Sequence, residues 1–165
     1  MKYLVSTLVF VLVSTVAATP LPTGSTDLSG TWTLVSVENT FADGRIVQPY
    51  GAKPEGMLTF DRAGRYSLLI FRPGRVRFAA NDKSRGTAEE YRDAVQGTNS
   101  HFGRYAVDAE THTLTFRIDR ASFPNWEGTE QRRAFVVDGD ALRYTVRTTS
   151  TGGTETGEVT WRRLP

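Results

Sequence analysis

The chain has 165 residues, of which 39% are hydrophobic, a size that suits one globular domain and leaves little room for a second. The formal net charge is only +2 and no block of basic residues occurs, so nucleic acid is not an expected partner. The absence of cysteine excludes disulfides, thiolate metal sites and thiol nucleophiles.

The N-terminus has the form of a secretory signal peptide. Lys2 supplies a positive charge, residues 3–16 form an apolar run broken only by Ser and Thr, and Val16-Ala17-Ala18 offers a cleavage site. The sequence therefore predicts a signal peptide over residues 1–18, a flexible mature N-terminus over 19–27 and a domain over 28–165. The protein is expected to be secreted or lumenal in the secretory pathway. The run is short for a membrane span, so no stable span is expected after cleavage; an uncleaved anchor is the alternative.

The first segment with strand character covers residues 28–37, in which β-branched residues dominate. Strict alternation places Trp32, Leu34 and Ser36 on one face and the residues between them, with Val37, on the other. The sequence thus predicts that Val37 faces away from Trp32.

Strand and turn signals then alternate to the end of the chain. Asp-Gly pairs at 43–44 and 138–139 mark hairpin turns, and a further turn is expected at 151–153. One helix is predicted over 86–95, with Thr87 as its N-cap and Glu90 as the capping-box partner. Eight or nine strands joined by short connections close most simply into an antiparallel barrel. The expected fold is an all-β barrel with one helix between the middle strands.

Several motifs resemble the lipocalin-like domain family, a calycin-type β-barrel. They are Gly30-Thr31-Trp32, residues 102–108, the turn at 138–142 and, most specifically, Phe123-Pro124-Asn125-Trp126 followed by Gly-Thr and Gln-Arg-Arg. The resemblance covers about residues 28–163. It implies a barrel with an internal ligand cavity and no defined reaction. It also implies that Trp32 closes one end of the barrel under a basic residue of the last strand, Arg162 or Arg163.

The Phe-Pro-Asn-Trp segment is the first candidate site. Pro124 cannot donate to a strand ladder and forces a break, which re-aims the side chains that follow it. Asn125 and Trp126 are then expected at the rim or inside the cavity, where they suit an aromatic ligand with a carbonyl or hydroxyl group. Alternatively, the Asn satisfies its own bulge and the Trp belongs to the core.

Arg133 is the second candidate, because it alternates in phase with Phe135 and Val137 and is expected to point inward. A buried guanidinium must be paired or must hold an anionic group. Its partner is either a ligand or a carboxylate such as Glu130 or Asp119.

The remaining candidates are less specific. Tyr66, Tyr105 and Phe116 are expected to line the cavity. His101 could shuttle protons, although its isolation favours a surface position, and His112 is expected in a solvated turn. The histidines and carboxylates lack metal-ligand spacing and no phosphate-binding loop occurs, so neither metal nor cofactor is expected.

The predicted function is a secreted lipocalin-like protein that binds a small apolar or aromatic molecule in its barrel. One alternative is a cofactor-free cyclase or isomerase of secondary metabolism, with Arg133, His101 and Tyr66 as catalytic residues. A second alternative is a secreted protein-interaction module. A monomer or weak homodimer is expected.

Overall fold

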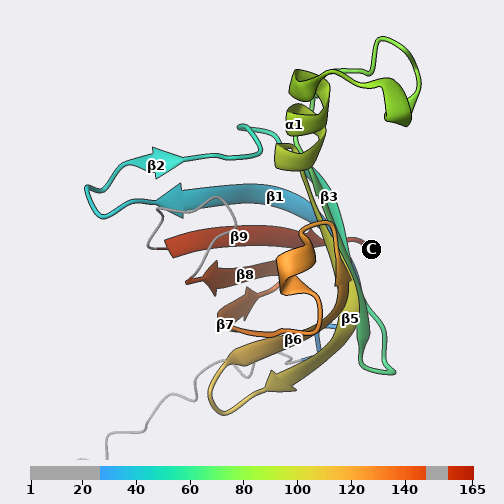
Figure 1. Ribbon diagram of the computed structural model, residues 1–165. Coiled ribbons are helices and arrows are strands. Elements are labelled where there is room, and N and C mark those ends of the chain that lie inside the picture. Colours follow the sequence, from blue (N-terminus) through green and yellow to red (C-terminus); the bar gives the residue numbers. More distant parts are fainter. Residues whose placement is uncertain (1–26, 148–155) are drawn as a thin grey trace, which may run out of the picture.

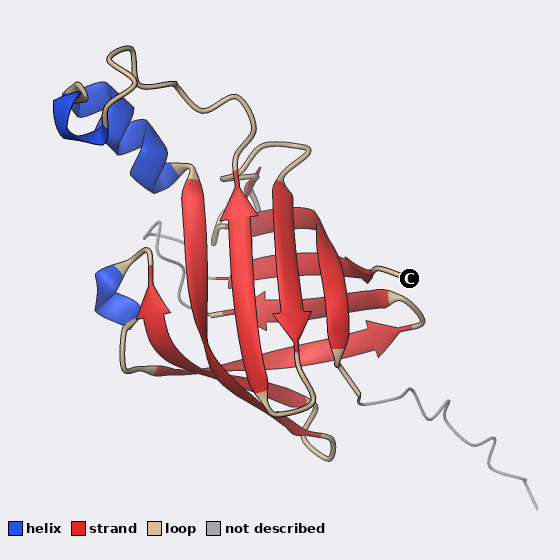
Figure 2. Cartoon of the chain, turned by 90° about the vertical axis from the view of Figure 1, so that its right-hand side faces the viewer, coloured by secondary structure: helices blue, strands red, loops and turns tan. Residues whose placement is uncertain are grey.

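Nine antiparallel strands form one sheet whose ends meet (Figures 1 and 2). In this computed structural model the described residues are 27–147 and 156–165. The sheet order is β2-β1-β3-β4-β5-β6-β7-β8-β9, and β1 also pairs with β9. This last pairing closes β1 and β3 to β9 into an eight-stranded barrel, with β2 as an extra strand on β1. The predicted antiparallel barrel with a single α-helix between middle strands is confirmed.

Most consecutive strands are joined by short connections, whereas residues 72–87 form a longer connection between β4 and α1. The bounds of the elements are β1 Gly30–Thr40, β2 Ile46–Val47, β3 Glu55–Phe60, β4 Arg65–Phe71, the 3₁₀ turn η1 Lys83–Arg85, α1 Ala88–Gln96, β5 Thr98–Asp108, β6 Thr113–Ala121, the 3₁₀ turn η2 Pro124–Trp126, β7 Glu130–Asp138, β8 Ala141–Val146 and β9 Thr156–Arg163. Both predicted Asp-Gly turns occur, with φ of 81° at Gly44 and 55° at Gly139. The predicted signal peptide (1–18), most of the segment 19–27 and the turn at 151–153 lie outside the described residues.

The face assignment predicted for β1 is wrong beyond Leu34. The pairing of β1 with β9 shifts register between Leu34 and Ser36, as a β-bulge does. Because one extra residue reverses the direction of every later side chain, Val37 and Asn39 are buried inside the barrel with Trp32. The bulge therefore brings Val37 and Asn39 to the inner wall.

The end of the barrel at the start of β1 is closed by Trp32. Its indole N–H donates to the Leu28 carbonyl at 3.0 Å, and the Arg163 guanidinium lies 4.1 Å from the ring centroid. Arg163 also donates to the carbonyls of Ser29 and Asp27. Gly30 has φ of 121°, and a Cβ there would lie 3.2 Å from the Arg163 guanidinium, so glycine permits this close approach. The expected packing of a last-strand arginine on Trp32 is confirmed for Arg163.

The predicted capped helix is α1. The Thr87 side chain accepts from the Glu90 N–H, and the Glu90 carboxylate accepts from the Thr87 N–H, which completes the capping box. Figures 1 and 2 show α1 outside the barrel, next to the start of β5. No helix among the described residues has the length and apolar character needed to cross a membrane.

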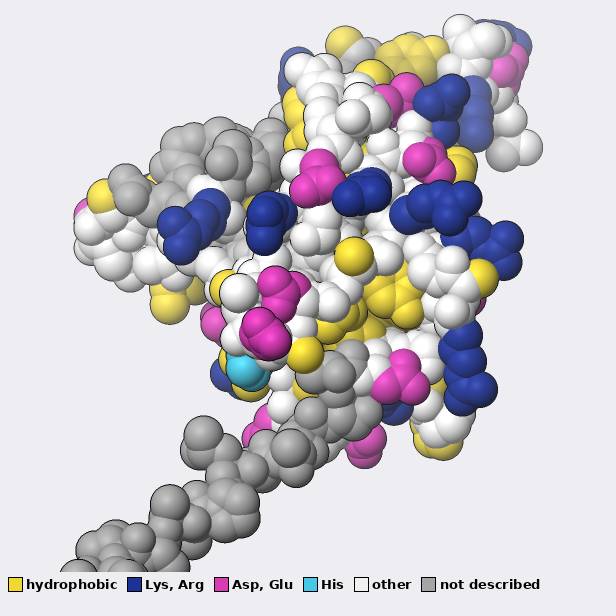
Figure 3. Space-filling model, turned by 90° about the horizontal axis from the view of Figure 1, so that it is seen from below, with side chains coloured by type: hydrophobic (Ala, Val, Ile, Leu, Met, Phe, Trp, Pro, Cys, Tyr) yellow, Lys and Arg dark blue, Asp and Glu magenta, His cyan; other side chains and the backbone are white. Residues whose placement is uncertain are grey.

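The core fills the barrel from the Trp32 end, and most charged residues of the described structure lie outside it. Trp161, Phe60, Phe116, Leu58 and Leu114 are all less than 2% exposed. Figure 3 shows acidic and basic side chains intermixed over the face it presents, without a patch of one sign. The feature that departs from this pattern is a group of polar side chains inside the barrel.

Candidate functional site

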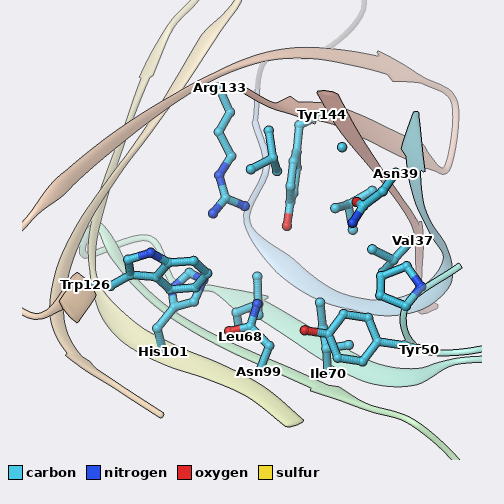
Figure 4. A pocket seen from close by; sticks show the side chains of 14 residues that line it. Val37, Asn39, Tyr50, Leu68, Ile70, Asn99, His101, Trp126, Arg133 and Tyr144 are labelled. Atoms are coloured by element: carbon cyan, nitrogen blue, oxygen red, sulfur yellow. The ribbon is translucent and has the colours of Figure 1, made fainter. Parts of the chain in front are cut away.

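A small cavity of about 50 Å³ lies inside the barrel, beyond the packed core (Figure 4). Aliphatic side chains form part of its wall, and several polar side chains point into it. The labelled lining residues are Val37, Asn39, Tyr50, Leu68, Ile70, Asn99, His101, Trp126, Arg133 and Tyr144. The interior is thus neither filled by hydrophobic side chains alone nor lined only by them.

Strand alternation positions most of these side chains. The buried positions of β4 are Tyr66, Leu68 and Ile70, and those of β7 are Arg133 and Phe135. Since inward residues recur at every second position, each strand carries its cavity residues in phase with its core residues. The cavity is therefore a direct extension of the core, with polar groups at some of its inward positions.

Arg133 is the only cavity-lining residue, among those described, that carries a full charge near neutral pH. Its side chain is 5% exposed, and its guanidinium carbon lies 4.7 Å from the ring centroids of both Phe116 and Tyr144. Its Nη2 donates to the Gln131 side-chain oxygen at 2.7 Å, and its Nε has no partner. Of the two alternatives for its partner, the carboxylate does not occur: Glu130 pairs with Arg117, and no ion pair of Arg133 is found among the described residues.

His101 is buried, not at the surface as its isolation suggested. It is 3% exposed, and its Nδ1 lies 2.7 Å from the Tyr66 hydroxyl. Burial, reinforced by the nearby charge of Arg133, lowers the pKa of His101 to about 3. Burial also raises the pKa of Tyr66. Both groups are neutral at neutral pH. In the tautomer that carries its proton on His101 Nε2, the Tyr66 hydroxyl donates to Nδ1.

Unpaired polar atoms converge on the cavity. Five buried side-chain atoms in the described residues lack a hydrogen-bond partner, and four of them belong to cavity-lining residues: Asn99 Oδ1, His101 Nε2, Arg133 Nε and the Tyr144 hydroxyl. Arg133 and the Trp161 indole lie near the Tyr144 hydroxyl and oppose the rise that burial causes in its pKa, but neither bonds it with good geometry. Native interiors leave few such atoms unpaired, so the polar groups around this cavity have hydrogen-bonding capacity that the described protein atoms do not use.

The structure brings together three of the predicted site residues. His101, Trp126 and Arg133 line the cavity, and the Trp126 ring lies edge-on to His101 with centroids 5.8 Å apart. Tyr66 lies one layer behind, bonded to His101, and Phe116 lies under the Arg133 guanidinium. Tyr105 packs on Phe60 and donates to the Asp61 carbonyl, away from the cavity. Asn125 is exposed on η2 and His112 is exposed, as predicted for the latter.

Sequence reasoning missed four polar residues that line the cavity: Asn39, Tyr50, Asn99 and Tyr144. Tyr144 alternates with Leu142 in a clear strand pattern, and this alternation was the available signal. Tyr50 lies in a Pro/Gly-rich loop and Asn99 near the start of β5, where no periodic pattern fixes the direction of a side chain. The Asn99 side chain hydrogen-bonds the Tyr50 hydroxyl.

A second, larger hollow of about 410 Å³ adjoins the cavity on its outer side. The two share Pro49, Tyr50 and Asn99 as wall residues. The outer hollow is also bordered by Phe123 and by Val95 and Gln96 at the end of α1. Tyr50 and Asn99 therefore separate the inner cavity from this vestibule.

Acid is expected to destabilise the fold through His101. The unfolded histidine takes up a proton below about pH 6.5, whereas the folded one resists protonation down to about pH 3, so stability falls as the pH is lowered through this window. From about pH 7 to about pH 5 the His101 contribution to the free energy of unfolding should fall by about 2 kcal/mol. Urea titrations of the wild type and of His101→Phe at several pH values measure this contribution. An equal dependence of the free energy of unfolding on pH in both proteins would contradict the prediction.

The chain is similar to the following known proteins. The model of the lipocalin-like domain family matches residues 29–164. The 4'-hydroxy-3'-methoxypropiophenone carrier protein ppsC of Aspergillus oryzae (strain ATCC 42149 / RIB 40) is 31% identical over 107 residues, which are 60% of this chain and 96% of that protein. A mutant of the fluorescent protein UnaG superposes with a TM-score of 0.37 at 12% identity, over 83% of this chain and 96% of that one.

Proposed function

The chain belongs to the lipocalin-like domain family, and from this we propose that it is a carrier that binds a small aromatic molecule bearing oxygen substituents in its barrel. The related ppsC is named as a carrier of a hydroxy-methoxypropiophenone, an aromatic ketone with a phenol group. A ligand of this kind combines a flat apolar ring with two hydrogen-bonding ends. We further propose, from the N-terminal sequence, that the protein is secreted.

The observation that supports the proposal most is the set of unpaired polar atoms around an otherwise aliphatic and aromatic cavity. The wall offers flat contact surface through Trp126 and Tyr144 and aliphatic surface through Leu68 and Ile70. Arg133 Nε and His101 Nε2 supply donors, and Asn99 Oδ1 supplies an acceptor. Binding sites for small molecules characteristically combine apolar walls with a few placed polar groups.

The size of the cavity requires a movement on binding. A cavity of about 150 Å³ accepts benzene, whereas the inner cavity measures about 50 Å³. Tyr50 stands between this cavity and the vestibule, in the loop between β2 and β3. A displaced Tyr50 side chain would join the two spaces, so that the ring of the ligand lies inside and its substituent extends outward past Pro49.

An isomerase or cyclase is the second candidate function, since Arg133, His101 and Tyr144 face one void. Such a reaction needs a group that accepts a proton near neutral pH. The pKa of about 3 makes His101 a poor base, and the raised pKa of Tyr66 keeps that hydroxyl protonated. These groups suit hydrogen bonding to a ligand better than proton abstraction, which favours the carrier.

Titration with 4'-hydroxy-3'-methoxypropiophenone is expected to quench the tryptophan fluorescence in a saturable manner. Trp126 lines the cavity, whereas Trp32 and Trp161 are fully buried in the core. The change on binding should therefore be largely lost in Trp126→Phe and retained in a Trp32→Phe control. Absence of saturable quenching by this phenone and by related aromatic ketones would contradict the proposal.

A further inference from the structure

We propose that the cavity binds its ligand as an anion, with an ionised oxygen of the aromatic molecule held against Arg133. The inference rests on the proposed carrier function and adds the charge state of the guest. The candidate guests are acidic phenols, which ionise to phenolates, and aromatic carboxylates. In both, the same chemistry is recognised: a negatively charged oxygen attached to a flat ring.

The charge of Arg133 lacks a counter-charge in the described structure. The side chain is 5% exposed, and every ion pair found among the described residues involves other arginines. The residues that line the cavity include no carboxylate. A buried charge without a partner is costly, and proteins keep one where it binds something. An anionic guest would supply the missing charge.

Gln131 holds the guanidinium without neutralising it. Its side-chain oxygen accepts from Nη2 at 2.7 Å, while the rings of Phe116 and Tyr144 flank the guanidinium. These contacts fix the group and leave Nε unpaired. A glutamate at position 131 would hold the group equally well and would cancel its charge. The neutral amide therefore preserves a positive charge at this point.

The other titratable groups around Arg133 add no negative charge. His101 on β5 faces it from across the cavity, with Tyr66 on β4 behind, and Tyr144 on β8 stacks beside it. All are neutral near neutral pH, because burial lowers the pKa of His101 and raises those of Tyr66 and Tyr144. Tyr50 is likewise neutral, since burial raises its pKa. Asp119 acts electrostatically on Tyr66 but its side chain is exposed on β6.

Figure 4 shows the guanidinium of Arg133 and the Tyr144 hydroxyl pointing toward the same space, with His101 opposite. An oxygen placed there would accept hydrogen bonds from Arg133 Nε and His101 Nε2. The Tyr144 hydroxyl can donate as well, since the groups near it, Arg133 and the Trp161 indole, are donors and do not accept its hydrogen. Charge-assisted hydrogen bonds of this kind favour the ionised form of an acid over its neutral form.

The test is an absorbance titration of 4'-hydroxy-3'-methoxypropiophenone, whose phenolate absorbs at longer wavelength than its phenol. Bound to the wild-type protein, its apparent pKa is expected to lie about one to three units below that of the free compound. Gln131→Glu should remove most of this shift with the cavity otherwise intact, as should Arg133→Gln. Arg132→Gln, an exposed site on the same strand, is the matched control and should keep the shift.

A second experiment distinguishes phenolates from aromatic carboxylates as ligands. Benzoate should displace the bound phenone more effectively than benzamide, its neutral counterpart, if a carboxylate can take the place of the phenolate. Binding of the phenone with an unchanged or raised pKa, or stronger displacement by benzamide, would overturn the inference and leave the carrier function standing. Failure of the phenone to bind in either form would overturn both.

Discussion

Replacement of Arg133 by methionine is expected to stabilise the empty protein and to weaken anion binding. Exchanging buried charged groups for apolar ones of similar volume often raises stability by about 1–4 kcal/mol. The loss of the cation–π contacts with Phe116 and Tyr144 reduces this gain in stability by about 0.5–1 kcal/mol for each ring. From the midpoints of these ranges, the free energy of unfolding should rise by about 1 kcal/mol, within limits of about −1 and +3 kcal/mol.

Ligand affinity should move in the opposite direction. Removal of one member of a buried charge pair weakens binding by about 2–5 kcal/mol, which corresponds to a loss of about 30-fold or more in affinity. If Arg133 served only to hold the barrel together, its replacement would instead lower the stability of the protein. The opposite signs of the two effects thus distinguish a binding residue from a structural one.

Urea denaturation and ligand titration of the same preparations measure the two quantities. Arg132→Met is the control, because Arg132 lies next to Arg133 on β7 but is exposed on the outer face. It should change stability by less than about 0.5 kcal/mol and leave affinity unaltered. A drop of several kcal/mol in Arg133→Met would show that the Gln131 contact and ring stacking hold the native structure together.

The parts of the site that the sequence predicts are those that strand periodicity governs. Period-two alternation in residues 131–137 fixes Arg133 inward together with Phe135, and β7 has this pattern. The same alternation predicts the wrong face for the later residues of β1, because the residues around Leu34 and Ser36 contain no sequence signal for the bulge. A bulge depends on how two strands distant in sequence align, and that information lies in the partner strand.

The properties of single polar residues were harder to predict, because they depend on tertiary contacts. The sequence predicts a surface position for His101, because the partner of its Nδ1, Tyr66, lies 35 positions away in the chain. Likewise, Glu130 was a plausible partner for Arg133, yet it faces outward and bonds Arg117. The lack of a counter-charge at Arg133 follows only from the closed barrel, which excludes the outward-facing carboxylates from its interior.

Replacement of Trp32 by alanine is the change expected to cost the most stability. Trp32 is fully buried at the closed end, and tryptophan-to-alanine changes in cores cost about 3–5 kcal/mol. Arg163 would lose the ring beneath its guanidinium, and the Leu28 carbonyl would lose its indole donor. Arg163→Ala keeps the indole and removes the guanidinium, with its contact to the ring and its hydrogen bonds to the Ser29 and Asp27 carbonyls, and should cost less, about 1–3 kcal/mol.

The effect on ligand binding should be small, because Trp32 and the cavity lie at different levels of the barrel. Val37, the nearest cavity-lining residue on β1, is five positions further along, about 16 Å at the usual rise of a strand. Under conditions where Trp32→Ala remains folded, its affinity for an aromatic ligand should match that of the wild type. Urea denaturation followed by circular dichroism gives the stability, and a tenfold weaker affinity of the folded variant would show that the closed end and the cavity are coupled.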